Sequence, residues 1–193
     1  MDVVIINYNA GNVQSVTYAL NRLGIEPILS DDSEVISAAD KVVFPGVGEA
    51  STAMRFLKTN GLDNLIKELK QPVFGVCLGL QLMCKHSEEN DTDCLGIFDR
   101  EVKKFEPKLK VPQMGWNTLT AKDSVLLEGL PDNPYVYFVH SYYAELSEHT
   151  VAKTDYVNPF SAALHKDNFY ALQAHPEKSG KVGEQILANF LKL

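Results

Sequence analysis

The segment QPVFGVCLGLQ, residues 71–81, decides the fold of this chain and points to its chemistry. An apolar run ends in the motif Gly-x-Cys-x-Gly, centred on Cys77, and a pattern typical of a helix follows. This order predicts a buried strand, a tight turn and a helix, which is the layout of a nucleophile elbow. The two glycines leave the space that such a turn needs on either side of the cysteine.

Cys77 would lie where a helix begins, and this position has two chemical consequences. The backbone N–H of Leu78 has no partner within the helix and can point toward the site. The positive end of the helix dipole favours a thiolate over a thiol. The competing interpretation is that Cys77 is a small buried side chain, as most free cysteines are. The elbow predicts a nucleophile, but it needs support from the rest of the chain.

The composition narrows the classes of protein to consider. A length of 193 residues, 45% of them hydrophobic, predicts a single domain over residues 1–193. The three cysteines lack metal-type spacing, which predicts reduced thiols and no metal site. A net charge of −7 argues against nucleic acid or an anionic membrane as partner. The chain shows neither a bilayer-spanning apolar run nor a secretory signal, so we expect a soluble, cytoplasmic protein.

Short apolar runs alternate with helical patterns in the first half of the chain. The pattern predicts strands at 3–6, 25–29, 41–44 and 73–76. It predicts helices at 12–23, 51–58 and 62–70, and a short helix capped by Ser33. In the second half it predicts strands at 102–105, 117–119, 135–139, 151–154, 160–165 and 169–172, and a helix at 180–191. We therefore expect an α/β fold with an open, mostly parallel central sheet flanked by helices. Additional short antiparallel strands are expected in the second half.

A nucleophilic cysteine needs a base, and the base needs an orienting group. His175, Pro176 and Glu177 follow the last predicted strand. In an extended segment, residues two apart point the same way, so Glu177 could hold one ring nitrogen of His175 and leave the other for Cys77. The alternative is a solvated surface turn. Together with Cys77, these residues predict a Cys-His-Glu triad.

Two glycine-containing segments could add to the site or to an interface. In open α/β sheets, sites form outside the carboxyl ends of the strands, where residues 7–12, 45–48 and Cys77 are all expected. Residues 45–48, PGVG, could turn backbone N–H groups toward an oxyanion, or could be an ordinary turn. Trp116, in PQMGWN at 112–117, is expected on a surface turn, where it could anchor a protein partner.

With Cys77, His175 and Glu177 in this order, the chain resembles the class I, or triad-type, glutamine amidotransferases. Within that family, its sequence blocks are similar to those of glutaminase subunits that work with a cyclase in histidine biosynthesis. The blocks are NYNAGN at 7–12, PGVG at 45–48, PQMGWN at 112–117, HSYY at 140–143 and HPEKS at 175–179. Their joint order extends over nearly the whole chain.

The resemblance implies that the protein hydrolyses L-glutamine to glutamate and ammonia. It places the oxyanion hole at Leu78, Val47 and Gly46, and implies that a partner completes the hole by reorienting the peptide N–H of Val47. The implied contacts to glutamine are Gly48, Gln81, Glu89, Ser141 and Tyr142. By residue type, Glu89 suits the α-ammonium group of glutamine.

The resemblance also implies no cofactor and a heterodimer with a (β/α)₈-barrel cyclase. The implied interface residues are Asn12, Trp116, Tyr137 and Lys178. Three alternatives remain at this point. The ammonia could go to a surface-sugar, purine or pyridoxal phosphate pathway, a triad could serve a peptidase, or the fold could be a non-catalytic binding module. The last alternative expects a lost triad residue, and the triad is complete.

Overall fold

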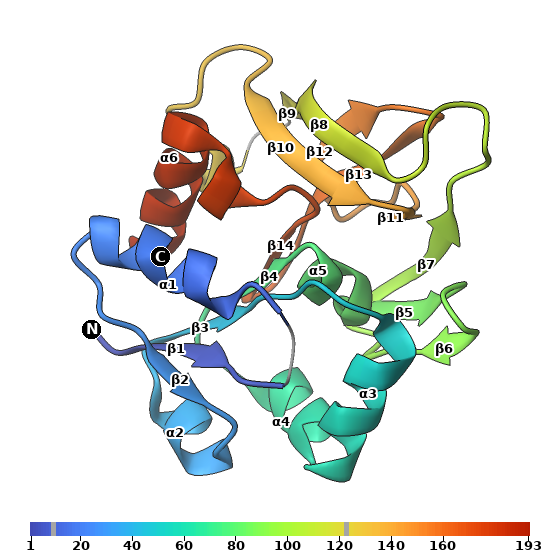
Figure 1. Ribbon diagram of the computed structural model, residues 1–193. Helices are drawn as coiled ribbons and strands as arrows, with labels where there is room; N and C mark the ends of the chain where they lie inside the picture. The colour runs from blue at the N-terminus through green and yellow to red at the C-terminus, as the bar shows by residue number, and fades with distance from the viewer. Residues whose placement is uncertain (9–10, 122–123) are drawn as a thin grey trace.

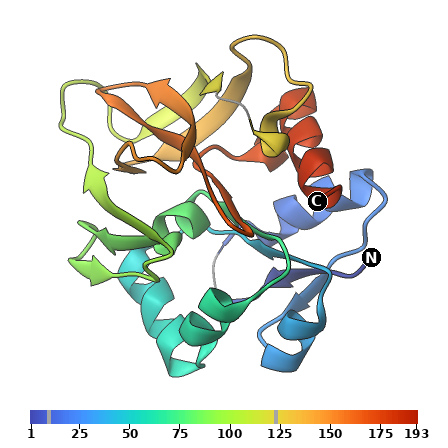
Figure 2. The same ribbon diagram turned by 180° about the vertical axis from the view of Figure 1, so that it is seen from behind.

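A central sheet of eight strands organises the described part of the molecule. The computed structural model describes residues 1–8, 11–121 and 124–193. Helices cover both faces of this sheet (Figure 1), and the view from behind shows the same layers (Figure 2). In spatial order, the strands are β2 (Ile28–Ser30), β1 (Val3–Ile6), β3 (Lys41–Phe44), β4 (Val73–Val76), β14 (Phe169–Leu172), β13 (Pro159–Lys166), β12 (Thr150–Asp155) and β9 (Thr120–Ala121).

Two smaller sheets and the helices complete the fold. One sheet pairs β10 (Tyr135–His140) with β8 (Gln113–Thr118). The other contains, in spatial order, β11 (Tyr142–Ala144), β7 (Phe98–Lys104), β5 (Cys84–Ser87) and β6 (Thr92–Asp93). The α-helices are α1 (Val13–Arg22), α2 (Ser33–Ala38), α3 (Ala50–Thr59), α4 (Leu62–Glu68), α5 (Leu78–Met83) and α6 (Gly180–Leu191), and the 3₁₀ helices are η1 (Val125–Leu127) and η2 (Pro176–Lys178).

The central sheet is parallel from β2 to β14 and antiparallel from β14 to β9. The predicted α/β fold, with its mostly parallel sheet and its antiparallel strands in the second half, is confirmed. β14 comes late in the chain but lies beside β4, with Leu172 opposite Val76. The backbone N–H of Cys77 donates to the carbonyl of Leu172 at 2.8 Å. This pairing brings the segment after β14 next to the cysteine.

Successive residues of the parallel strands pack into different layers, because side chains alternate across a sheet. In β1, Val4 and Ile6 belong to the core under α2, α3, α4 and α5. Val3 and Ile5 belong to the core under α1 and α6. The near-continuous apolar runs of the first half therefore reflect strands that are buried on both faces.

The structure differs from the sequence expectations at several local points: strands β5 and β6 were not predicted, and β7 begins at Phe98 rather than at residue 102. β2 begins at Ile28 rather than at residue 25, because only Ile28–Ser30 pair with β1. Asp32, rather than Ser33, caps α2: its carboxylate accepts hydrogen bonds from the N–H groups of Glu34 and Val35. The surface turn expected at 112–117 is largely strand β8, since its backbone pairs with β10.

Gly79 sits where α5 crosses the end of β3, and a Cβ there would overlap the backbone carbonyl of Phe44. A backbone atom cannot move aside cheaply, so alanine must push α5 away from β3. We expect Gly79→Ala to lower the free energy of unfolding by about 3 kcal/mol, the upper part of the usual range for overpacking. Urea denaturation measures this loss.

Gly61→Ala is a suitable control for that experiment. Gly61 has a positive φ, 70°, but no atom of the described residues lies within 4 Å of the position that a Cβ would take there. Only the left-handed backbone penalty of about 1 kcal/mol is expected for this variant. Equal losses for the two variants would show that the contact with Phe44 does not limit position 79.

Candidate active site

Cys77 occupies a strained turn between β4 and α5. Its backbone has φ 52° and ψ −102°, which is unusual for a residue with a side chain. Such strain persists only where the surroundings hold it, and it gathers at functional sites. Gly75 and Gly79 flank the turn, and a Cβ on Gly75 would crowd Gly79 and the sulfur of Met83. The local geometry therefore matches the elbow that the sequence predicts.

His175 lies beside Cys77 and is bonded to Glu177. Its Nδ1 atom lies 2.8 Å from Oε1 of Glu177, and both side chains are buried. Glu177 lies in the 3₁₀ turn η2, which follows His175 directly, rather than in the extended segment that the sequence argument assumed. The contact forms all the same, because the tight turn also brings residues two apart together.

The electrostatic environment of His175 favours an ion pair. Burial alone would lower its pKa, but the sulfur of Cys77 and the carboxylate of Glu177 outweigh this effect and raise the pKa above its ordinary value. Among the residues described, the buried Nε2 atom has no hydrogen-bond partner, and it is the nitrogen that Glu177 leaves free. The arrangement can hold a thiolate against a protonated imidazole.

Asn12 adds a fourth side chain to this group. Its Nδ2 atom donates a hydrogen bond to the same Oε1 atom of Glu177 that faces His175. Asn12 precedes α1 in the left-handed region, φ 71°, and its side chain does not cap that helix. The sequence argument placed Asn12 at a helix start and in the interface; its contact with Glu177, 165 positions away, left no signal in the sequence. Asn9 and Ala10 of the same block lie outside the described residues.

Cys77 opens onto a cavity of about 250 Å³. The five residues expected to contact the substrate come from separate parts of the chain, and all of them line this cavity together with Cys77. They are Gly48, Gln81, Glu89, Ser141 and Tyr142. Glu89 presents a carboxylate whose Oε2 accepts a hydrogen bond from the N–H of Ala50 at 2.8 Å. Burial raises the pKa of Glu89, with Ala50 acting in the opposite direction.

The predicted oxyanion hole is filled by the protein itself. The N–H of Leu78 donates to the carbonyl of Gly46 at 3.2 Å, and the N–H of Gly11 donates to the carbonyl of Val47 at 3.2 Å. The peptide between Gly46 and Val47 thus turns its oxygen toward Leu78. In this conformation the Leu78 donor is not free for a substrate oxygen, and rotation of that peptide would release it.

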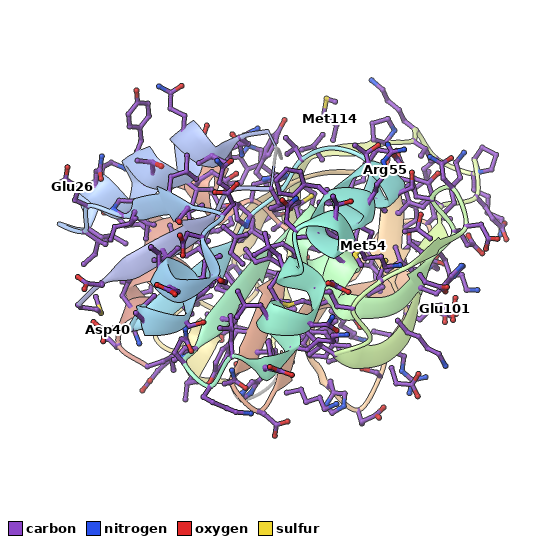
Figure 3. The ribbon with its side chains drawn as sticks, turned by 90° about the horizontal axis from the view of Figure 1, so that it is seen from below. Glu26, Asp40, Met54, Arg55, Glu101 and Met114 are labelled. Atoms are coloured by element: carbon purple, nitrogen blue, oxygen red, sulfur yellow. The ribbon has the colours of Figure 1, made fainter. Side chains whose placement is uncertain are left out.

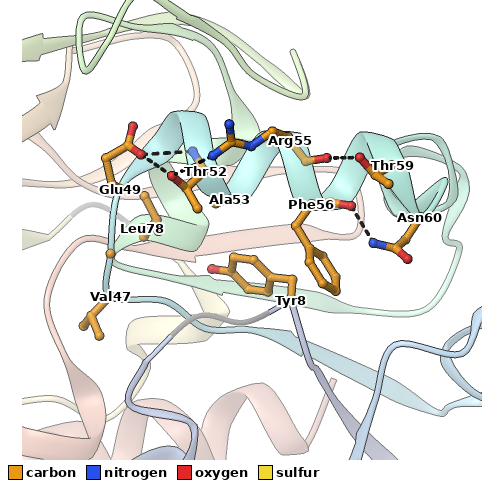
Figure 4. A pocket seen from close by; sticks show the side chains of 11 residues that line it. Tyr8, Val47, Glu49, Thr52, Ala53, Arg55, Phe56, Thr59, Asn60 and Leu78 are labelled. Atoms are coloured by element: carbon orange, nitrogen blue, oxygen red, sulfur yellow. Dashed lines mark hydrogen bonds between the residues drawn. The ribbon is translucent and has the colours of Figure 1, made fainter.

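A second, larger cavity of about 550 Å³ lies on the other side of this loop, between Tyr8 and helix α3 (Figure 4). It shares Val47, Gly48 and Leu78 with the smaller cavity. Its wall includes Phe56, and Glu49 caps α3 at its edge. Cys77 lines the smaller cavity, so its sulfur belongs to that one.

The aromatic residues expected at an interface lie together on the β8–β10 ribbon. Trp116 and Tyr137 sit opposite each other, with ring centroids 5.9 Å apart at 76°. Trp116 is 55% exposed and Met114 59% exposed, and Met114 projects from the surface in Figure 3. Lys178 is exposed on η2. The carbonyl of Tyr137 accepts a hydrogen bond from the N–H of His175 at 2.9 Å, so this face is joined to the triad.

Met114 was missed because residues 112–117 were expected to form a surface turn, whereas the exposed Tyr135 lies in a segment that was predicted to be a strand and was not singled out. Once β8 is known to be a strand, alternation places Met114 and Trp116 on one face of it. The same rule places Tyr135 and Tyr137 on one face of β10.

Comparison with known proteins identifies the family. Residues 4–193 match the family described as glutamine amidotransferase class-I. The chain belongs to the class-I glutamine amidotransferase family. The protein named imidazole glycerol phosphate synthase subunit HisH from Bacteroides thetaiotaomicron is 60% identical to this amidotransferase, with 100% of each chain covered. The protein of the same name from Yersinia pseudotuberculosis is 47% identical, again over 100% of both chains.

Solved structures show the same fold at low sequence identity. A crystal structure described as a glutamine amidotransferase superposes on this amidotransferase with a TM-score of 0.78 and 20% identity, covering 98% of this chain and 97% of the other. The structure of PurLQS from Thermotoga maritima gives a TM-score of 0.75 at 15% identity, covering 99% of this chain and 97% of the other. At this identity the likeness concerns the fold alone.

Within residues 1–8, 11–121 and 124–193, no group of three or more His, Cys, Asp or Glu side chains is arranged to hold a metal ion. No helix in the same ranges is long and apolar enough to cross a bilayer.

Proposed function

We propose that this amidotransferase is the glutaminase subunit of an imidazole glycerol phosphate synthase, and that Cys77, His175 and Glu177 form its triad. The observation that carries the proposal is the meeting of two sets of residues at one cavity. The buried group of Cys77, His175 and Glu177 reaches the cavity through the cysteine, and the expected glutamine contacts line its wall. The full-length similarity to proteins named HisH supports the choice of pathway.

The proposed reaction begins with attack by the Cys77 thiolate on the side-chain amide carbon of L-glutamine. The negative charge moves from sulfur to the amide oxygen. His175 then gives its proton to the departing nitrogen, ammonia leaves, and a glutamyl thioester remains on Cys77. Neutral His175 next takes a proton from water, which attacks the thioester. Glutamate departs and the thiolate is restored.

The oxyanion hole makes this chemistry dependent on a conformational step. With the Gly46 carbonyl bonded to Leu78, the developing oxyanion would meet an oxygen instead of a donor. Rotating the peptide between Gly46 and Val47 frees the N–H of Leu78 and turns the N–H of Val47 inward. One such donor stabilises the transition state by about 3 kcal/mol, or roughly a hundredfold in rate.

The proposed partner is a (β/α)₈-barrel cyclase, and together the two subunits would form a heterodimer. Free ammonia would be protonated and diluted in bulk water, so a partner that receives it directly is chemically useful. The products on the cyclase would be imidazole glycerol phosphate and an aminoimidazole carboxamide ribotide. Exposed Trp116 and Met114, with Tyr137 and Lys178 nearby, supply an aromatic and basic face for docking.

The test is the rate of glutamine hydrolysis with and without an added cyclase and the ligand of that cyclase. We expect slow hydrolysis by the isolated chain and a rise of at least about a hundredfold in the complex, from the completed oxyanion hole. Trp116→Ala should weaken the apparent affinity for the partner about 30-fold and leave the rate at saturation nearly unchanged.

The matched control for docking is Leu29→Ala. Leu29 is a half-exposed apolar residue on β2, an edge strand of the central sheet, to which β8 and β10 do not belong. Its replacement should leave the partner affinity unchanged. A rate that does not respond to the cyclase would contradict the proposed function, and failure to complement a histidine auxotroph would point to another ammonia acceptor.

A further inference from the structure

Gln173 lies against the reactive sulfur, and no step of the proposed reaction uses it. It follows β14 directly and is completely buried. Its side-chain Nε2 lies within hydrogen-bond distance of Sγ of Cys77, at 3.5 Å. A buried amide costs free energy unless its polar atoms have partners, so this contact is part of how the site is built.

The neighbouring hydrogen bonds fix which end of the Gln173 amide faces the sulfur. Nε2 of Gln81 lies 2.9 Å from the backbone carbonyl of Tyr142, and a carbonyl can only accept. The same nitrogen of Gln81 lies 3.2 Å from Oε1 of Gln173. A reversed Gln173 amide would set two NH₂ groups against each other and aim its oxygen at a thiolate. The donor end of Gln173 therefore faces Cys77.

This chain of hydrogen bonds extends back to the β8–β10 ribbon. The carbonyl of Tyr142 also accepts from Nδ1 of His140 at 2.7 Å. Burial lowers the pKa of His140 to about 4, so its ring is neutral and carries its proton on Nδ1. The other nitrogen, Nε2, lies 3.0 Å from Oε1 of Gln113. Because Nε2 can then only accept, a hydrogen bond here requires the Gln113 amide to turn its NH₂ group to this side. The Cys77 sulfur therefore lies at one end of a series of hydrogen bonds that passes through Gln173, Gln81, the carbonyl of Tyr142 and His140.

We propose that Gln173 is a catalytic residue that donates a hydrogen bond to the Cys77 thiolate and that Gln81 holds its amide in the donating orientation. The inference rests on the proposed role of Cys77 as nucleophile. A hydrogen bond to the charged form of a group favours that form. When the sulfur attacks, its charge passes to the substrate oxygen and the bond from Gln173 weakens. Gln173 thereby increases the fraction of thiolate and makes each thiolate somewhat less nucleophilic.

The two effects of this donor have opposite signs, and together they give a distinctive pH profile. Without the bond, we expect the pH midpoint of thiolate reactivity to rise by about one unit. A more basic thiolate is also a better nucleophile, by about threefold for one pH unit. Removing Gln173 should therefore slow the reaction of Cys77 about threefold at low pH and speed it about threefold on the high-pH plateau. A loss that comes only from disturbed packing would lower the reaction rate both at low pH and on the high-pH plateau.

The experiment measures alkylation of Cys77 by iodoacetamide in the full chain between pH 5 and pH 10. Mass spectrometry of the peptide that carries Cys77 separates it from Cys84 and Cys94. The variant is Gln173→Met, which keeps the length of the side chain and removes the donor. Gln185→Met is the matched control, because Gln185 lies on α6 and bonds to Asn189 instead. The control should follow the wild-type profile at every pH.

A crossing of the Gln173→Met and wild-type profiles supports the proposal. Coincident profiles, or a uniform loss at all pH values, overturn it and leave the proposed glutaminase function untouched. If Gln173→Met does not fold, Gln81→Met gives the same test. It frees the Gln173 amide to turn and should shift the profile in the same direction by a smaller amount, and an unshifted profile there overturns the proposal. Absence of alkylation at Cys77 in the wild type would contradict the nucleophile assignment itself.

Discussion

Replacing Cys77 with alanine is expected to abolish glutamine hydrolysis, with a loss of about 10⁶-fold in kcat. Cys77 forms the only bond between enzyme and substrate in the proposed reaction, and no other group lining the described cavity offers an equivalent nucleophile. Residues that act as a unit in a triad lose nearly all of their effect when the nucleophile is removed. The measurement is ammonia release by the complex with the cyclase, where the wild-type rate is highest.

Two other variants show whether such a loss is specific. Cys94→Ala removes a half-buried thiol whose pKa burial raises to about 12, and it should retain full activity. Cys77→Ser keeps the shape of the side chain and should still be nearly inactive, because the serine hydroxyl ionises far less readily than the thiol. Hydrolysis by Cys77→Ala at more than a small fraction of the wild-type rate would rule out the proposed triad.

The sequence was sufficient to predict the parts of the fold that repeat a strong local pattern. β4 and the elbow follow from an apolar run that ends in Gly-x-Cys-x-Gly. Helix α6 has the predicted bounds, Gly180–Leu191, because its apolar spacing is clear over its full length. The parallel sheet follows from strands that are apolar on both faces and alternate with helices.

Contacts between distant segments could not be predicted in the same way. The amide of Asn12 reaches Glu177, and the amide of Gln173 reaches Cys77, across 165 and 96 positions. Nothing in the local sequence around an Asn or Gln reveals which carboxylate or sulfur its side chain will meet. These contacts depend on the order of strands in the sheet, and in particular on β14 lying beside β4.

The oxyanion loop shows a second limit, which concerns conformation rather than topology. Its glycines predict that the peptide units can turn, but not which way they point. The bond from Leu78 to the Gly46 carbonyl shows the direction, and it leaves the hole without its donors. The hypothesis is that Cys77 stays inactive until a partner completes the oxyanion hole. The hydrogen bond from Leu78 to Gly46 is a specific contact that such a partner would have to break.

Glu177→Gln, alone and combined with Asn12→Ala, is expected to show how the base is oriented. Nδ2 of Asn12 can only donate, so it keeps an oxygen of residue 177 at the position that also faces Nδ1 of His175. In the single variant, the side-chain amide of residue 177 should therefore place its oxygen there and preserve the proton on Nδ1. The remaining loss is that of the negative charge, about a hundredfold in kcat, as for a hydrogen bond that involves a charged group.

In the double variant, the side-chain amide of residue 177 is free to turn its NH₂ group toward Nδ1 of His175. That orientation moves the ring proton to Nε2, where His175 can no longer accept a proton from the thiol or from water. The loss should then approach about 10⁴-fold, the size expected for a histidine held in the wrong tautomer. Asn12→Ala by itself should cost much less, because the carboxylate can only accept from Nδ1 whichever way it points.

Nitrogen NMR of His175 distinguishes these cases independently of activity. Glu177 is one of the groups that raise the pKa of His175, so either variant should lower that pKa, because an opposite charge has been removed. The tautomer should remain Nδ1–H in the single variant and change to Nε2–H only in the double variant. A full 10⁴-fold loss in Glu177→Gln alone, with the proton on Nε2, would show that Asn12 does not hold the oxygen in place. The orientation of His175 is therefore expected to depend on Asn12, at the start of α1, as well as on Glu177.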